Sequence, residues 1–412
     1  MPLNTKNTDF LQRNEAIDVL RAFTMLTMIF VNHLWTVQDV PHGLLHAKNG
    51  EDFMGLSDVV FPCFLFVVGL SIPYAIERRY SKGLSGRSTI GHIFSRSLAL
   101  LMMGVFIVNS EAGLSSEMPY GKTVYSLLMV IGFFCLWNQY PETNRKNQRL
   151  LYLGLKITGA LILLYLAITF RSAGDNSVFS ARWWGILGLI GWTYLVCATI
   201  YVFTRNRLKY LIPIWIAFVL ICLLGTRMNE VSGGSFLLSL PRPNFYNQLL
   251  DTLHIGNGTL VAFTMGGVLW SVLNVRYQSV PGLKKALWAG VILAVLLLAG
   301  FVSHRYWILS KLSATPPWLF YVLAISIGLY ILFYGLVEKG KTSWFTIIKP
   351  AGTATLTTYM MPYLAYCLAD FFLLLPDYLW RGIPGLANCL CFSLLMVGFT
   401  WLLGKMHIKL KV

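Results

Sequence analysis

The chain has 412 residues, of which 56% are hydrophobic and only 12% are charged, and its mean hydropathy is +0.63. A soluble protein of this length needs far more charge on its surface, so the composition excludes a soluble globular class and predicts a membrane protein. The net charge of +16 does not indicate nucleic-acid binding, because the basic residues lie in short loops and form no stripe with interleaved aromatics.

Apolar stretches of roughly 18 to 22 residues recur along the chain, each long enough to cross a hydrocarbon core of about 30 Å as a helix. The strands of a transmembrane β-barrel are shorter and alternate in polarity, so that class is excluded. The sequence predicts an all-α fold, a polytopic transmembrane helical bundle of about 12 spans. The expected helices cover 17–35, 56–77, 90–109, 121–138, 150–170, 183–204, 208–226, 256–274, 285–303, 317–337, 345–371 and 384–404. The span at 345–371 has an alternative start at Pro350, because proline suits a first helical turn.

Lysine and arginine are distributed unevenly between alternate loops. One set of loops, together with both tails, carries about 20 of them, and the other set carries about nine. Basic residues are retained in the cytoplasm during insertion, so both termini are predicted to be cytoplasmic and the loop at 36–55 extracytoplasmic. The chain shows no linker or low-complexity stretch, which predicts a single integral-membrane domain over residues 1–412.

Two further features narrow the class of protein. The seven cysteines all fall in apolar segments without CxxC or metal-ligand spacing, so no metal site is predicted. The first apolar stretch contains Asp18 and Arg21 and precedes no small-residue cleavage site, which favours a retained helix over a signal peptide. Trp318, close to the start of a span, is interpreted as an interfacial anchor.

Polar residues inside apolar spans are costly, so each is a functional candidate until a structural partner explains it. Asp18 and Arg21 lie three residues apart on one helical face, where a local ion pair and a functional role are both open. Asn32 and His33 lie near the far end of the same predicted helix. Arg96 lies within another apolar helix, where it must be paired or solvated.

Several of these residues belong to motifs that resemble heparan-α-glucosaminide N-acetyltransferase and its bacterial relatives. The matching motifs are Ile17-Asp18-Val19-Leu20-Arg21-Ala22, Val31-Asn32, His46-Ala47, the block from Gly55-Leu56-Ser57-Asp58 to Phe66, Arg96-Ser97-Leu98 with Gly104, and a looser pattern of Trp318, Tyr321, Gly340-Lys341 and Tyr359. The resemblance covers residues 14–110 well and 316–404 more loosely. As a set the motifs are specific, whereas each alone is weak.

The resemblance implies an enzyme of the bacterial inner membrane that acetylates the amine of a terminal glucosamine outside the cytoplasm, with cytosolic acetyl-CoA as co-substrate. The family's catalytic histidine falls on His46, and its partner asparagine falls on Asn32. The wider superfamily of membrane acyltransferases has a histidine where this chain has Asn32, which leaves the adjacent His33 as a second candidate and His42 as a third. Asp58 could cap its helix, orient His46 or bind substrate hydroxyls.

The phosphates of coenzyme A need cations near the cytoplasmic face. Arg21, Arg78, Arg79 and Arg96 are available there. Positive-inside topology explains Arg78 and Arg79 more simply than ligand binding does, whereas it does not explain Arg96.

Other functions remain open on the sequence alone. The alternatives are an O-acyltransferase of envelope glycans and a transporter or flippase of sugar-containing lipids. The expected partners are the lipid bilayer and a small-molecule or glycan acceptor, with no nucleic acid, and homo-oligomer formation is open. The chain departs from the family in the fourth helix, which has Lys122-Thr123-Val124 in place of an Arg- and Gln-containing motif. It also has three spans between that helix and 256–274, where the eukaryotic enzyme has one.

Overall fold

The computed structural model describes residues 9–116, 118–228, 235, 237, 257–278, 280, 282–372 and 376–412. Helices dominate these residues, because a helix satisfies its own backbone hydrogen bonds within an apolar segment. The helices are α1 (Glu15–His33), α2 (Leu56–Ser81), α3 (Gly86–Glu111), α4 (Lys122–Trp137), α5 (Lys146–Thr169), α6 (Gly185–Thr204), α7 (Leu208–Gly225), α9 (Thr259–Arg276), α10 (Gly282–Ser303), α11 (Pro316–Glu338), α12 (Phe345–Thr353), α13 (Thr355–Phe372) and α14 (Gly382–Lys405). Within the described ranges the chain forms isolated β-bridges but no strand, so the prediction of an all-α fold is confirmed.

Each predicted span coincides with a helix or, for 345–371, with two. By length and composition, ten of the helices in the described residues are able to cross a membrane, and α4 is a shorter apolar helix. The protein is therefore a polytopic helical membrane protein, while the count of about 12 spans and the cytoplasmic termini stay predictions.

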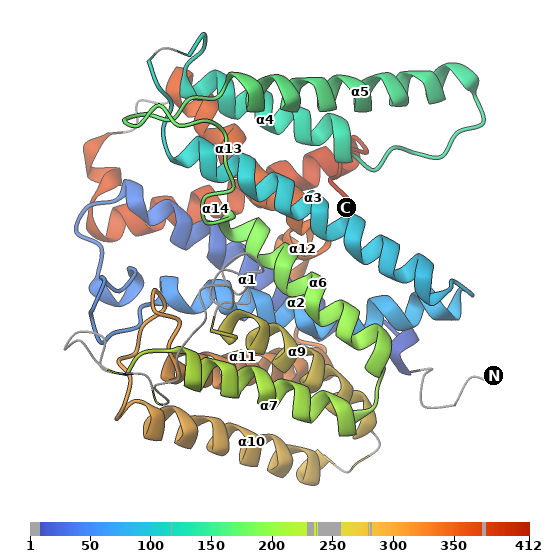
Figure 1. Ribbon diagram of the computed structural model, residues 1–412, viewed down its shortest axis with the longest axis vertical. Coiled ribbons are helices and arrows are strands. Elements are labelled where there is room, and N and C mark those ends of the chain that lie inside the picture. The colour runs from blue at the N-terminus through green and yellow to red at the C-terminus, as the bar shows by residue number, and fades with distance from the viewer. Residues whose placement is uncertain are drawn as a thin grey trace. The chain divides into compact units, whose positions relative to one another are not determined.

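The chain divides into two compact units, each built from segments far apart in the sequence (Figure 1). Unit 1 comprises Met1–Thr24, Pro41–Ser97 and Trp192–Trp344, and unit 2 comprises Met25–Val40, Leu98–Gly191 and Phe345–Val412. Helices α1, α3 and α6 each contribute one segment to either unit. The prediction of one domain over the whole chain stays a prediction.

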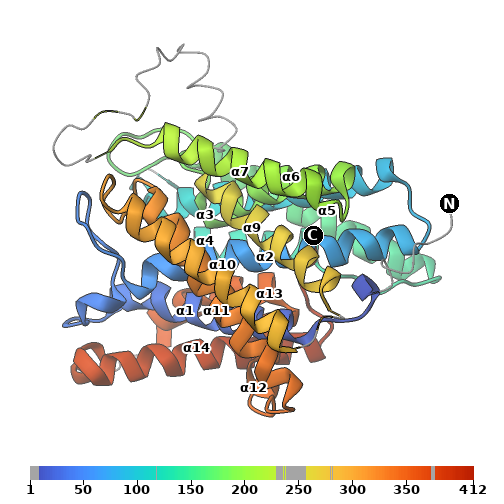
Figure 2. The ribbon, with the colours of Figure 1, turned by 90° about the horizontal axis from the view of Figure 1, so that it is seen from below.

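The centre of unit 1 is the contact between α2 and α9, with α7 beside α9 and α10 beside α11 (Figure 2). Two glycines let the α2 and α9 backbones meet. A Cβ atom on Gly69 would lie 1.9 Å from the Thr264 carbonyl oxygen, and one on Gly267 would lie 2.1 Å from the Phe66 carbonyl oxygen. Small residues commonly allow such close helix contacts in membrane proteins.

Unit 2 contains the pair α4 and α5, with α13 packed on both α4 and α14. The α4–α5 contact also depends on a glycine, because a Cβ atom on Gly159 would lie 2.8 Å from the Gly132 carbonyl oxygen. Helix α5 otherwise presents large apolar side chains at its surface, among them Leu161 and Ile168. Such a surface suits contact with lipid.

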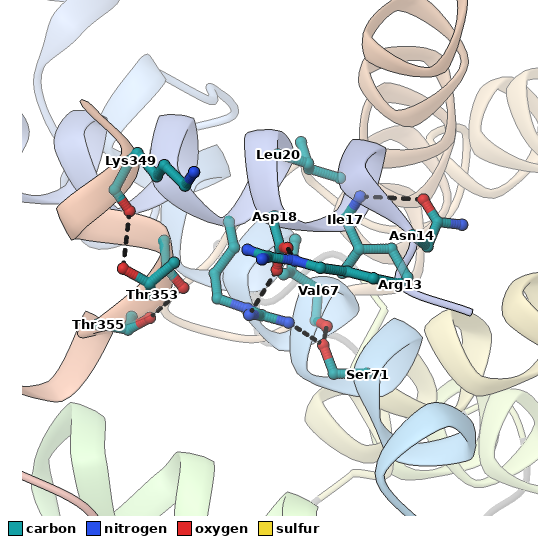
Figure 3. A network of polar contacts seen from close by, with 12 residues as sticks. Arg13, Asn14, Ile17, Asp18, Leu20, Val67, Ser71, Lys349, Thr353 and Thr355 are labelled. Atoms are coloured by element: carbon teal, nitrogen blue, oxygen red, sulfur yellow. Dashed lines mark hydrogen bonds and ion pairs between the residues drawn. The ribbon is translucent and has the colours of Figure 1, made fainter. Parts of the chain in front are cut away.

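The span predicted at 345–371 is interrupted, but its break does not fall at Pro350. Pro350 lies inside α12, and α13 begins at Thr355. Threonine hydroxyls bond to backbone carbonyls on either side of the break: Thr353 Oγ1 donates to Lys349 O at 3.1 Å, and Thr355 Oγ1 donates to Gly352 O at 3.2 Å (Figure 3).

Candidate active site

The first turn of α2 in unit 1 holds a buried carboxylate. Gly55 is the N-cap of α2, and its N–H donates to Asp58 Oδ2 at 3.2 Å, which is the capping-box arrangement. The preceding loop folds back onto this turn, because a Cβ atom on Gly55 would lie 1.9 Å from the Leu45 carbonyl oxygen. Ser57 Oγ also donates to Leu44 O at 2.5 Å. The sequence therefore fixes the loop at 42–55 against the helix that carries Asp58.

Asp58 also binds His46, so it both caps α2 and orients the imidazole. The Asp58 side chain is 2% exposed, and its Oδ1 lies 2.7 Å from His46 Nδ1. The Ala47 N–H donates to Oδ2 at 2.9 Å. An ionised carboxylate is only an acceptor, so the Nδ1 atom carries the proton and Nε2 carries the lone pair.

The His46 side chain is 54% exposed. No described residue hydrogen-bonds to its Nε2 atom. This half of the imidazole can therefore accept a proton from a molecule outside the protein.

Lys311 is a third member of this site that the sequence reasoning missed. Its Nζ atom lies 3.3 Å from His46 Nδ1 and 3.9 Å from Asp58 Oδ1. Burial lowers the pKa of Lys311, and the Asp58 carboxylate opposes that shift. Lys311 and His46 are 265 residues apart, so no local motif joins them. The sequence offered one signal for Lys311: it lies between the predicted spans 285–303 and 317–337, in a loop on the side that is poor in basic residues.

The loop that carries Lys311, between α10 and α11, is held from two sides. On one side, Asn257 Nδ2 and Thr259 Oγ1 donate to the Ala314 carbonyl oxygen at 2.7 and 2.8 Å. Trp307 Nε1 donates to Thr226 O at 3.0 Å. These bonds fix the backbone on either side of Lys311.

On the other side, Asp52 joins this loop to the loop of His46. Its Oδ1 atom accepts the Leu309 N–H at 2.7 Å and lies 2.7 Å from His304 Nε2. Burial raises the pKa of Asp52, but the bonds from Leu309 and His304 outweigh it, and the net result is a lowered pKa. The carboxylate thus stays ionised, and the two loops stay connected.

The second and third candidate histidines, His33 and His42, have structural partners. His42 Nε2 lies 2.9 Å from Glu51 Oε1, and its ring stacks on Phe53 with the centroids 4.1 Å apart. His33, in unit 2, is buried, with Nδ1 2.9 Å from the Tyr366 hydroxyl and its ring stacked on Phe392 at 3.9 Å. Both rings thus have protein partners, and a catalytic role for either stays a prediction.

Asn32 lies on the part of α1 that belongs to unit 2. It is exposed, whereas the adjacent His33 is buried, as expected for neighbours rotated by about 100° on a helix. No described residue hydrogen-bonds to the Asn32 side chain. Its pairing with His46 stays a prediction.

The first candidate arginine, Arg21, forms the local ion pair that its spacing allowed. Arg21 Nη1 donates to Asp18 Oδ1 at 3.2 Å, and Nη2 donates to Ser71 Oγ of α2 at 2.6 Å. Asp18 also binds Arg13, whose Nε lies 2.5 Å from Oδ2 (Figure 3). One carboxylate therefore serves two guanidinium groups, which leaves net positive charge at this point.

The remaining candidate arginines differ in their surroundings. Arg96 lies over the Tyr194 ring, 4.8 Å from its centroid, and Arg78 is exposed and donates to Leu11 O at 3.4 Å. In the described residues, the buried Nε atoms of Arg96 and Arg79 have no hydrogen-bond partner. The charges of Arg96 and Arg21 also repel each other. Guanidinium groups with an unpaired N–H donor or a neighbouring positive charge favour the binding of an anionic ligand.

Trp318 is not an interfacial anchor. It is 1% exposed, its Nε1 donates to the Asp58 carbonyl oxygen at 3.0 Å, and its ring packs on Phe263. The described residues contain no group of three or more metal-ligating side chains.

These features define the class: a polytopic helical membrane protein with a carboxylate-bound histidine and a nearby lysine at one end of unit 1. A family model described as "Domain of unknown function (DUF5009)" matches residues 13–238, more than half of the chain. The chain belongs to this family.

Two curated relatives share part of the sequence. Heparan-alpha-glucosaminide N-acetyltransferase of Mus musculus is 31% identical over 147 residues, which is 32% of this chain and 21% of that protein. The Homo sapiens protein of the same name is 31% identical over 102 residues, 24% of this chain and 14% of that protein. The matches thus span about a fifth or less of the relatives' length.

Proposed function

We propose that this chain is a transmembrane acetyltransferase that moves an acetyl group from cytosolic acetyl-CoA to an extracytoplasmic amino sugar of the glucosamine type. The observation that carries the proposal is His46, which the buried Asp58 orients and whose Nε2 is hydrogen-bonded by no described residue. The partial similarity to two enzymes named as N-acetyltransferases supports the reaction class.

The chemistry asks for a base beside the acceptor amine. As the amine nitrogen attacks the thioester carbonyl, His46 Nε2 takes its proton, the new C–N bond forms and the C–S bond breaks. The bonding electrons of the C–S bond pass to sulfur, and the imidazolium returns its proton to the thiolate. The carboxylate-bound ring, with its lone pair on Nε2, suits this task.

A two-step course is the alternative within the same site. In that course His46 Nε2 itself attacks the thioester, and the C–S bond breaks with its electrons passing to sulfur. The amine then displaces the acetyl group from the imidazole, and its proton passes to the thiolate. In either course Asn32 is proposed to donate a hydrogen bond to the developing oxyanion. Asp58 keeps the ring oriented in both.

For the donor, we assign the phosphates of acetyl-CoA to the arginines of unit 1. Arg79 and Arg96 have buried Nε atoms without partners in the described residues, and the charge of Arg96 repels that of Arg21. A bound phosphate would accept hydrogen bonds from the Nε atoms and reduce the repulsion between the two charges. Arg78 is exposed and has the weakest claim. Asp58 and Arg79 lie on one helix, roughly 30 Å apart at about 1.5 Å per residue. The donor head and the reacting carbonyl would thus lie toward opposite ends of α2.

The direct test incubates the purified protein in lipid nanodiscs with acetyl-labelled coenzyme A and a panel of amino sugars. We expect label in an N-acetyl product, together with one free thiol for each acetyl group transferred. Matched sugars with a hydroxyl in place of the amine are the control. Label in those sugars alone would favour O-acylation, and no label in any acceptor from folded protein would contradict the proposal.

A further inference from the structure

We propose that Lys311 is a positioning residue that supplies the counter-charge of Asp58 and thereby keeps His46 neutral and ready to accept a proton. This inference rests on the proposed function, in which His46 acts as a base. Lys311 lies outside every motif on which the family resemblance rests.

The argument starts from the charge of Asp58. Its side chain is 2% exposed, and it accepts N–H bonds from Ala47 and Gly55, which an ionised carboxylate favours. A buried carboxylate needs a cation nearby. Within the described residues, the cation comes either from Lys311 or from a protonated His46.

The geometry assigns the charge to Lys311. The 2.7 Å contact commits the Nδ1 proton of His46 to Asp58, so Lys311 cannot donate to that nitrogen although it lies only 3.3 Å away. Its Nζ donates instead to Ser57 O at 3.4 Å and acts on the pair as a charge, 3.9 Å from Asp58 Oδ1. A cation at this distance disfavours a second positive charge on the ring.

Among the described residues, the other cationic side chains of these loops have no recorded contact with Asp58. His42 is paired with Glu51, His304 is paired with Asp52, Arg305 lies over the Phe301 ring, and Lys48 is exposed. Lys311 itself is only 24% exposed, and its loop is held through the Ala314 carbonyl. The held loop and the burial of the side chain therefore keep the ammonium close to Asp58. Burial lowers the pKa of Lys311, and the Asp58 carboxylate opposes that lowering.

The test measures the protonation of His46 without relying on acetyl transfer. Diethylpyrocarbonate modifies only a neutral imidazole, so brief exposure across roughly pH 5 to 9, followed by mass spectrometry of the peptide with His46, reports the neutral fraction. Full-length protein in nanodiscs is used as the wild type and as Lys311→Met, Lys311→Gln and Lys311→Arg. Lys48→Met is the matched control, because Lys48 is exposed in the same loop as His46.

We expect Lys311→Met and Lys311→Gln to move half-modification of His46 upward by about one pH unit, because protonated His46 must then balance Asp58. Lys311→Arg should keep the wild-type profile, and Lys48→Met should move it far less. The glutamine variant keeps a donor for Ser57 O and serves if the methionine variant does not fold. An unmoved profile in a folded Lys311→Met or Lys311→Gln variant, or an equal move in Lys48→Met, would overturn the proposal.

Activity separates this inference from the proposed function. Well below the midpoint of the modification profile, Lys311→Met should lose acetyl transfer about tenfold if that midpoint rises by about one pH unit, and above the midpoint the loss should disappear. A loss that is equal at every pH would indicate a structural role and would overturn the proposal. If the modification profile moves but the protein transfers no acetyl group, the positioning role of Lys311 is supported and the proposed acetyltransferase function is refuted.

Discussion

At the residue scale, the site divides its tasks among a few side chains. Asp58 is buried and fixes the ring of His46, whereas His46 is half-exposed and offers its second nitrogen. His42 has a carboxylate partner too, but its Nε2 is the atom that is bound. Two features therefore distinguish His46 from His42: its carboxylate partner is 2% exposed against 29% for Glu51, and the ring nitrogen left unbonded by the described residues is Nε2 rather than Nδ1.

The arginines proposed to bind the phosphates of acetyl-CoA differ enough in their surroundings to be tested in pairs. Arg96→Ala should weaken coenzyme A binding by about tenfold or more, because a charge-assisted bond to phosphate in a partly buried site is worth roughly 1.5–3 kcal/mol. Arg78→Ala should weaken it far less, because Arg78 is exposed and its guanidinium already donates to Leu11 O. Titration calorimetry on folded variants measures both constants. Equal losses of coenzyme A affinity in the two variants would contradict a specific role of Arg96 in binding the ligand.

At the element scale, the α2–α9 contact positions Asp58, and glycine makes that contact feasible. Gly69→Ala should lower the stability by about 1–3 kcal/mol or more, because its Cβ atom would overlap the Thr264 carbonyl oxygen. Gly328→Ala in α11 is the matched control, since a Cβ atom there meets no described atom within 4 Å. Thermal unfolding in detergent compares the two variants. A Gly69→Ala protein as stable as the control would contradict this packing.

Sequence patterns predicted the helices well because an apolar run has few alternatives to a helix. The alternative helix start at Pro350 is wrong, because Pro350 lies inside α12 and the next helix, α13, begins at Thr355. Trp318 was misassigned because its partner at Asp58 is a long-range contact.

The candidate site was predictable where its residues are close in sequence. His46 and Asp58 share one loop and one helix start, so a motif reaches both. Lys311 comes from a distant loop, and only the folded unit 1 brings it to them. The bonds of Asn257 and Thr259 that hold its loop are equally long-range.

At the scale of the whole molecule, the orientation in the membrane decides on which side His46 works. The imbalance of about 20 basic residues against about nine predicts that residue 145 is cytoplasmic and that the loop at 36–55 is not. A reporter active only in the cytoplasm should give signal when fused after Arg145 and none when inserted in that loop. The opposite pattern would reverse the topology and remove the donor arginines from the cytoplasmic side.

The most direct test of the proposed base compares His46→Ala with His42→Ala in the labelled-acetyl assay. Both are exposed loop histidines paired with a carboxylate, so both variants should fold, as gel filtration and thermal unfolding would verify. His46→Ala should lower acetyl transfer by a factor of about 100 to 10,000, the usual contribution of a general base, while His42→Ala keeps most of the activity. A folded His46→Ala protein that transfers acetyl groups at the wild-type rate would contradict the assignment of His46.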